Sequence, residues 1–121
     1  MSQANVELNQ GAVVAKALLR ASDFMNIKKK ELAAMMKINQ STLTRALNKG
    51  IEPQSLKGEV GLMVIRVYRS LSALSGNNHD FMSHFLRTKN KYFNAKPIDV
   101  MQSMEGLVML NNYLDGMRGK V

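Results

Sequence analysis

The sequence predicts an all-α protein in which an N-terminal helix-turn-helix bundle packs with a C-terminal helical domain. Apolar residues recur at steps of three and four along most of the chain, which is the spacing of one helix face. Alternation with a period of two, which is typical of a strand, never persists. The 121 residues are enough for one domain, or for two very small ones sharing a core.

The first half of the chain is expected to form three helices after a polar, flexible segment at residues 1–9. Asn39 is a good N-cap for the third helix, and Gly50 stands where that helix should end. A linker at residues 51–55 follows. The three helices are predicted at residues 11–25, 28–36 and 40–47.

The second half contains the strongest helical pattern, at residues 56–74. Leu62 and Ile65 widen its apolar face, so we expect this helix to be buried on two sides. Pro97 fits the first position of a later helix, because proline needs no N–H there. The remaining expected segments are a turn at 75–78, a helix around 81–86, a basic irregular stretch at 89–96, and a last helix at 107–117 that ends near Gly119.

Residues 31–47 read as two short helices that meet at a tight turn. Ala33 is small enough for the helices to cross closely, and Ile38 fills the turn. The second helix presents side chains that can hydrogen-bond to base edges, and none of them is acidic. Lysines at the start of the first helix suit phosphate contacts. The candidate DNA-binding residues are Lys28, Lys29, Lys30, Gln40, Ser41, Thr42, Thr44, Arg45 and Lys49.

This stretch resembles the Xre-type, phage-repressor-like helix-turn-helix, commonly seen as "ELAxxxGxSxSTxSRxL". The resemblance implies sequence-specific DNA binding. One departure is that Lys37 stands where the family usually has glycine. A left-handed backbone there costs lysine about 1 kcal/mol relative to glycine. A helical pair that serves only for packing or dimerisation is the alternative.

Composition limits the classes of function. Seventeen Lys and Arg against nine Asp and Glu give a formal charge of +8, which favours an anionic partner such as nucleic acid or an acidic protein surface. There is no cysteine, and His79 and His84 are the only histidines. These two point in different directions on a helix, so we expect no metal site. No nucleophilic triad or phosphate-binding glycine loop is recognisable, so neither an enzyme nor a cofactor is expected.

Residues 85–101 resemble the toxin-binding domain of Xre/MbcA/ParS antitoxins, which typically reads "W-L-x-T-x-N-x-x-L/F-x-G-x-x-P-x-D/E-L/M". Phe85 stands where tryptophan is usual and Ala95 where glycine is frequent, whereas Gly106 and the helix after it fit the family pattern. With the first motif, the resemblance covers roughly residues 10–121. It implies an all-helical antitoxin, commonly a homodimer, that blocks the active site of a RES-domain, NAD-consuming toxin and represses its own operon at operator DNA.

In that family the C-terminal end lies at the mouth of the toxin pocket. Carried over to this sequence, the toxin-binding candidates are Asp115, Gly116, Met117, Arg118, Gly119, Lys120 and Val121. Alternatively, Arg118 and Lys120 only interact with the negative end of the last helix. The resemblance divides the chain into a helix-turn-helix region at 10–55 and a dimerisation and toxin-binding domain at 56–121.

A second class of function remains open, namely a stand-alone DNA-binding regulator that uses its C-terminal half only to dimerise. The start of the chain lacks the features of a signal peptide, and no apolar run is long enough to span a membrane, so we expect a cytoplasmic protein. Lys89, Lys91 and Lys96 surround Tyr92 and Phe93. This basic-aromatic stretch could stack on nucleic acid, contact the toxin, or cover the core, with Phe93 packed and the lysines in solvent.

Overall fold

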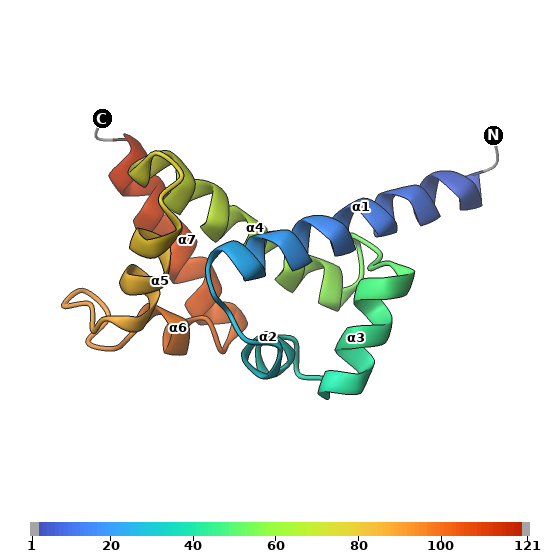
Figure 1. Ribbon diagram of the computed structural model, residues 1–121, viewed down its shortest axis with the longest axis horizontal. Helices are drawn as coiled ribbons and strands as arrows, with labels where there is room; N and C mark the ends of the chain where they lie inside the picture. Colours follow the sequence, from blue (N-terminus) through green and yellow to red (C-terminus); the bar gives the residue numbers. More distant parts are fainter. Residues whose placement is uncertain (1–2, 120–121) are drawn as a thin grey trace.

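The computed structural model describes residues 3–119, and their side chains from residue 10 onward (Figure 1). Within these residues no strand is present, and one β-bridge joins Asn90 to Ala95. None of the described helices is long and apolar enough to cross a membrane. The all-α prediction is confirmed. The helices are α1 (Gln3–Phe24), α2 (Lys29–Met36), α3 (Gln40–Lys49), α4 (Leu56–Ser75), α5 (His79–Arg87), α6 (Pro97–Val100) and α7 (Met104–Gly119).

The first helix begins nearer the N-terminus than the sequence predicted, at Gln3 rather than Gly11. The residues before Gly11 are mostly polar and therefore give no helical hydrophobic period. Val13 fits the apolar period of this helix but is 66% exposed. The buried apolar residues of α1 are Val14, Ala15, Leu18 and Ala21, and Met25 is buried just after the helix ends.

Several helix starts lie where local sequence signals predicted them. The Asn39 side chain accepts a hydrogen bond from the Thr42 N–H at 2.8 Å, which caps α3. Asn78, the last residue of the expected turn at 75–78, caps α5 in the same way, from the Phe81 N–H at 3.0 Å, and α5 begins at His79, before the expected range 81–86. Pro97 occupies the first turn of α6. These three signals are local, so they act independently of the rest of the fold.

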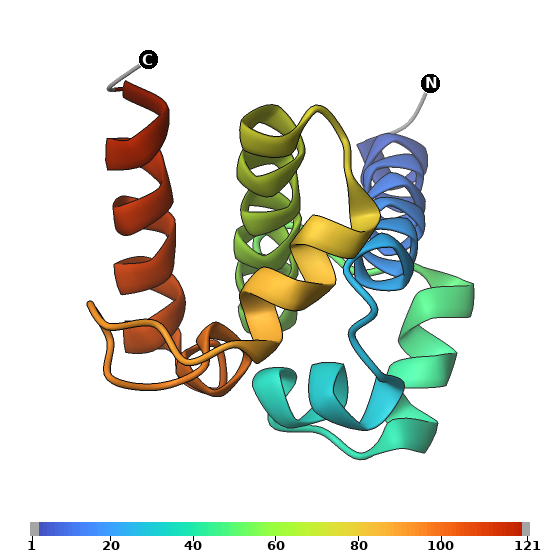
Figure 2. The same cartoon turned by 60° about the vertical axis from the view of Figure 1, so that its left-hand side comes forward.

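Helix α4 lies between α1 and α7 and runs in the same general direction as both helices (Figures 1 and 2). Burial on two sides is therefore confirmed for this helix, and Ile65 is buried as expected. Leu62 is different, because it is 43% exposed. It shares an exposed stripe of α4 with Arg66 and Arg69, and of these the Arg66 side chain reaches Asp115 of α7.

The buried residues of both halves form one continuous cluster. Leu18 and Leu43 come from the first half, and Met101 and Leu110 from the second. The start of α7 lies so close to α6 that a Cβ atom on Gly106 would overlap the Val100 carbonyl oxygen. The two halves therefore share a core. As a result, the surface of one half has a fixed position relative to the surface of the other.

Candidate functional site

The turn between α2 and α3 adopts the left-handed conformation that the helix-turn-helix resemblance implied. Lys37 has φ 59° and ψ 39°, in the region where glycine is favoured. Its N–H donates to the Ala34 carbonyl at 3.2 Å, and the Ile38 N–H donates to the Ala33 carbonyl at 3.1 Å. These bonds satisfy carbonyls at the end of α2. The chain can then enter α3 directly, so that both helices form one compact unit.

Most of the predicted DNA-binding side chains lie on the surface. Lys28, Lys29 and Lys30 are exposed at the start of α2. On α3, the exposed members are Gln40, Ser41, Thr44, Arg45 and Lys49.

Thr42 departs from the other candidates on α3. Its side chain is half-buried, and its hydroxyl accepts a hydrogen bond from Arg45 Nη2 at 3.3 Å. The threonine therefore supports the arginine from the preceding turn of the helix. This contact holds the guanidinium against the helix surface, in a position from which Arg45 can still reach outward.

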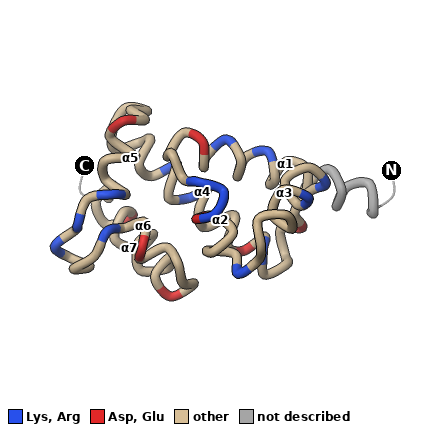
Figure 3. The backbone as a smooth tube through the Cα atoms, turned by 60° about the horizontal axis from the view of Figure 1, so that its bottom comes forward, with Lys and Arg blue, Asp and Glu red and all other residues tan. Residues whose placement is uncertain are grey.

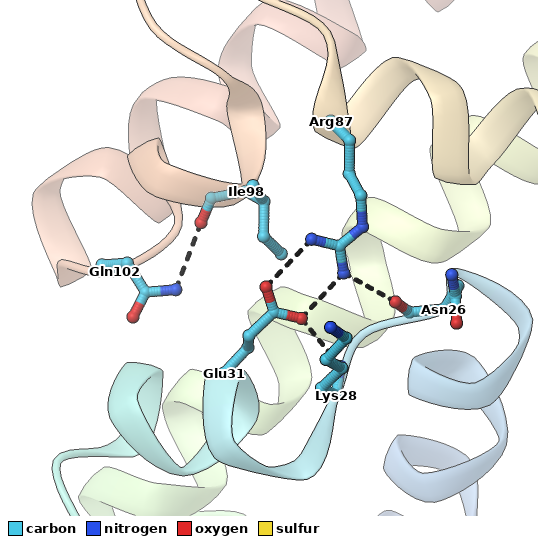
Figure 4. Close-up of polar contacts among 6 residues, drawn as sticks. All are labelled: Asn26, Lys28, Glu31, Arg87, Ile98 and Gln102. Carbon is cyan, nitrogen blue, oxygen red and sulfur yellow. Dashed lines mark hydrogen bonds and ion pairs between the residues drawn. The ribbon is translucent and has the colours of Figure 1, made fainter.

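The helix-turn-helix is fixed to the second half by an ion pair that the sequence did not reveal (Figure 4). Arg87, at the end of α5, donates to both carboxylate oxygens of Glu31 on α2, at 2.7 and 3.0 Å. It also donates to the Asn26 carbonyl at 2.8 Å. Glu31 in addition accepts the Lys28 N–H at 2.9 Å, which closes the start of α2.

The charges of this pair affect each other's ionisation. The hydrogen bonds from Arg87 hold the pKa of the Glu31 carboxyl below its ordinary value of 4.5, although burial opposes that shift. The same hydrogen bonds raise the pKa of Arg87. The pair is therefore fully charged near neutral pH, and α2 is held against α5 by a charge-assisted, two-pronged contact.

A second polar tie joins the two halves at the helix-turn-helix turn. Lys37 Nζ donates to the Gln102 carbonyl, just before α7, at 2.7 Å. Lys37 thus has a role that glycine could not have, which gives a physical reason for the departure from the family pattern.

Some of the toxin-binding candidates at the C-terminal end contact α4, and others are exposed. The Asp115 carboxylate is paired with Arg66 of α4. Arg118 donates to the Ser70 hydroxyl at 3.3 Å. Gly116, Met117 and Gly119 are exposed, whereas Lys120 and Val121 lie outside the described residues. One side of the last described turn of α7 is thus bound to α4, and its other side is exposed to solvent.

The histidines do not come together. His79 stacks on Phe24 of α1, with ring centroids 4.3 Å apart, and His84 is exposed on α5. Among the described residues, no three His, Cys, Asp or Glu side chains are grouped so as to hold a metal ion. The described side chains accordingly offer binding surfaces, and we identify no metal centre on them.

Comparison with known families gives two matches. The model for the antitoxin Xre-like helix-turn-helix domain matches residues 4–58. The model for the antitoxin Xre/MbcA/ParS C-terminal toxin-binding domain matches residues 70–120. Comparison with curated protein sequences gave no match. Both matched families are regulatory rather than enzymatic, and they occur here in the order that the sequence motifs suggested.

Proposed function

Because the chain belongs to the Xre/MbcA/ParS antitoxins, we propose that it neutralises a RES-domain, NAD-consuming toxin by covering that enzyme's active site. The chain carries the toxin-binding and helix-turn-helix domains of an antitoxin. The proposal assigns toxin binding to residues 56–121 and DNA binding to residues 10–55. It makes no use of a cofactor or a metal.

The toxin-binding proposal rests on how the last turn of α7 is held against α4. Asp115 and Arg118 are held by Arg66 and Ser70, so the end of the helix has a fixed direction. Between these two anchors the helix exposes a small residue and an apolar one, Gly116 and the 39%-exposed Met117. A pre-oriented end loses less conformational entropy when it enters a pocket than a loose end would. In this proposal, residues 115–121 enter the mouth of the toxin pocket.

We further propose that the chain represses its own operon. The exposed polar surface of α3 supports base contacts by Gln40 and Arg45, and the lysines at the start of α2 support phosphate contacts. A homodimer is part of this proposal, because helix-turn-helix proteins commonly read two half-sites as dimers. The experiment is gel filtration with light scattering, with and without operator DNA.

The toxin-binding proposal is tested by removing residues 118–121 and co-expressing the shortened chain with the RES-domain toxin. Among the residues that the structure describes, this deletion removes no buried apolar side chain, because the last one in α7 is Leu114. We expect the toxin to deplete cellular NAD while the shortened chain still binds operator DNA. Arg118→Ala in the full-length chain loses the same Ser70 contact but keeps the end of the chain, so stronger protection by this variant than by the shortened chain would separate the loss of the end from the loss of the anchor.

Full protection by the shortened chain would refute the role of the C-terminal end. Toxin binding would then depend on other residues of 56–121, whereas failure of the full-length chain to protect would favour the second class of function, a DNA-binding regulator whose C-terminal half only dimerises.

A further inference from the structure

The segment between α5 and α6 forms a projecting loop, which we call the basic loop (residues 88–96). It contains Lys89, Lys91 and Lys96, all exposed, and no acidic residue. Neither ion pair found among the described residues involves these lysines. The loop therefore presents unneutralised positive charge to the solvent.

Hydrogen bonds within the loop fix its shape. The Asn90 N–H donates to the Ala95 carbonyl at 2.9 Å, and the Asn94 N–H donates to the Asn90 carbonyl at 2.8 Å. The Asn90 side chain accepts the Tyr92 N–H at 2.8 Å. Asn94 has φ 55°, a left-handed conformation that asparagine tolerates. The loop is thus a closed turn with a defined conformation.

Aromatic rings pack between this turn and α7. Tyr92 lies 4.9 Å from Tyr113 of α7 and 5.0 Å from Phe93, measured between ring centroids. Phe93 is half-buried against the core, as the sequence suggested, but Tyr92 is 70% exposed. The cluster anchors the loop to α7 and leaves the outer side of Tyr92 and the lysines available to a partner.

The loop lies on the same side of the molecule as α2, and the C-terminal end of α7 lies away from it (Figures 1 and 2). Figure 3 looks at this side and shows Lys and Arg on the loop, at the left, and on α2, in the middle, with Asp and Glu of α6 and α7 in the same view. The acidic residues nearby in the sequence, Asp99 and Glu105, are on α6 and α7 and not in the loop. Arg87, immediately before the loop, is bound to Glu31 of α2. This ion pair fixes the position of the basic loop relative to the lysines of α2.

We propose that the basic loop is a second DNA contact, which binds the phosphate backbone beside the site bound by α2 and α3. Lysine is a flexible point charge suited to phosphates, and it is depleted in protein–protein interfaces. Tyr92 adds a hydroxyl that can donate to a phosphate oxygen. The contact carries no base specificity. It rests on the proposed DNA binding, and it extends the footprint into the domain that binds the toxin.

The test compares two triple variants of the full-length chain that lose the same charge. One is Lys89→Ala, Lys91→Ala, Lys96→Ala. The control is Lys16→Ala, Arg20→Ala, Arg69→Ala, which removes exposed cations of α1 and α4. Circular dichroism first establishes that both fold. Fluorescence anisotropy then measures binding to the DNA upstream of the gene and to a random duplex of equal length, over a range of salt concentrations.

We expect the loop variant to bind both duplexes more weakly, with a shallower dependence of log affinity on log salt. Each lysine that contacts a phosphate contributes about 0.9 to that slope, so the full loss is up to about 2.7. The control variant should keep the wild-type slope.

Three results would overturn the proposal. If both variants bind DNA with the same slope as the wild-type chain, the loop makes no contact and DNA binding by α2 and α3 stands. If the loop variant binds DNA as the wild-type chain does but no longer protects cells that co-express the RES-domain toxin, the loop belongs to the protein interface. If the wild-type chain binds neither duplex, the proposed DNA function fails together with the loop.

Discussion

Replacing Glu31 with glutamine removes the charge that faces Arg87 but leaves an oxygen to accept the Lys28 N–H. Hydrogen bonds to charged groups contribute about 1.5–3 kcal/mol, whereas exposed ion pairs contribute about 0–1 kcal/mol. The Glu31 and Arg87 side chains are 20% and 33% exposed, which is between these limits. We therefore expect Glu31→Gln to lower the free energy of unfolding by about 1–2 kcal/mol at neutral pH.

The effect should depend on pH in a defined direction. The pKa of Glu31 is lower in the folded state than its ordinary value of 4.5, because Arg87 stabilises the carboxylate. The unfolded chain therefore takes up a proton first as the pH falls. The stabilising contribution is complete above the unfolded-state pKa and is lost as the pH falls through the folded-state pKa. At lower pH the difference between the wild-type chain and Glu31→Gln should shrink.

Urea unfolding followed by circular dichroism, at neutral pH and in acid, measures this difference. A double-mutant cycle with Arg87→Met isolates the coupling of the pair from the contact between Arg87 and the Asn26 carbonyl. Glu52→Gln is the matched control, because Glu52 is exposed and outside any ion pair found among the described residues. Equal stability of Glu31→Gln and wild type at neutral pH, or a loss that does not change in acid, would refute the reasoning.

The remaining predictions concern the backbone and DNA binding. Lys37→Gly should be more stable than Lys37→Ala by about 1 kcal/mol in urea unfolding, because both lose the lysine contact and only alanine keeps the strained backbone. Gly106→Ala should destabilise the fold by about 1–3 kcal/mol or more, because the added Cβ would overlap the α6 backbone. Gly116→Ala places its Cβ in open space and should stabilise α7 by up to about 1 kcal/mol. Thermal melting compares the two variants. Arg45→Ala should weaken operator binding by about 1–3 kcal/mol and relax the preference at one base pair, while Lys29→Ala should weaken binding to all sequences and lower the salt slope by about one. Equal effects of these two variants on every sequence, measured by anisotropy, would exclude Arg45 as a base reader.

The parts of the fold that the sequence predicted depend on neighbouring residues. Asn39 caps the residues next to it, and the backbone of Pro97 is already suited to a first helical turn. The left-handed turn at Lys37 could be predicted from the resemblance, even though lysine has no local preference for it. Such features depend on only a few consecutive residues, so the local sequence is enough to predict them.

The features that the sequence did not reveal join distant parts of the chain. Glu31 and Arg87 are 56 positions apart, and no local pattern distinguishes this arginine from the other exposed cations. The signal at Glu31 was its position three residues after Lys28, which fits a helix cap but does not identify a partner. The exposure of Leu62 was missed for the same reason, since it depends on which stripe of α4 its neighbours cover.

The central claim, that this chain is an antitoxin for a RES-domain enzyme, is tested most directly by identifying its partner. The tagged full-length chain is recovered from its native host at moderate salt after nuclease treatment, and the bound proteins are identified by mass spectrometry. We expect a near-stoichiometric RES-domain protein that a chain lacking residues 118–121 does not retain. Recovery of no protein partner, together with DNA in a parallel sample without nuclease, would contradict the account and indicate a stand-alone regulator.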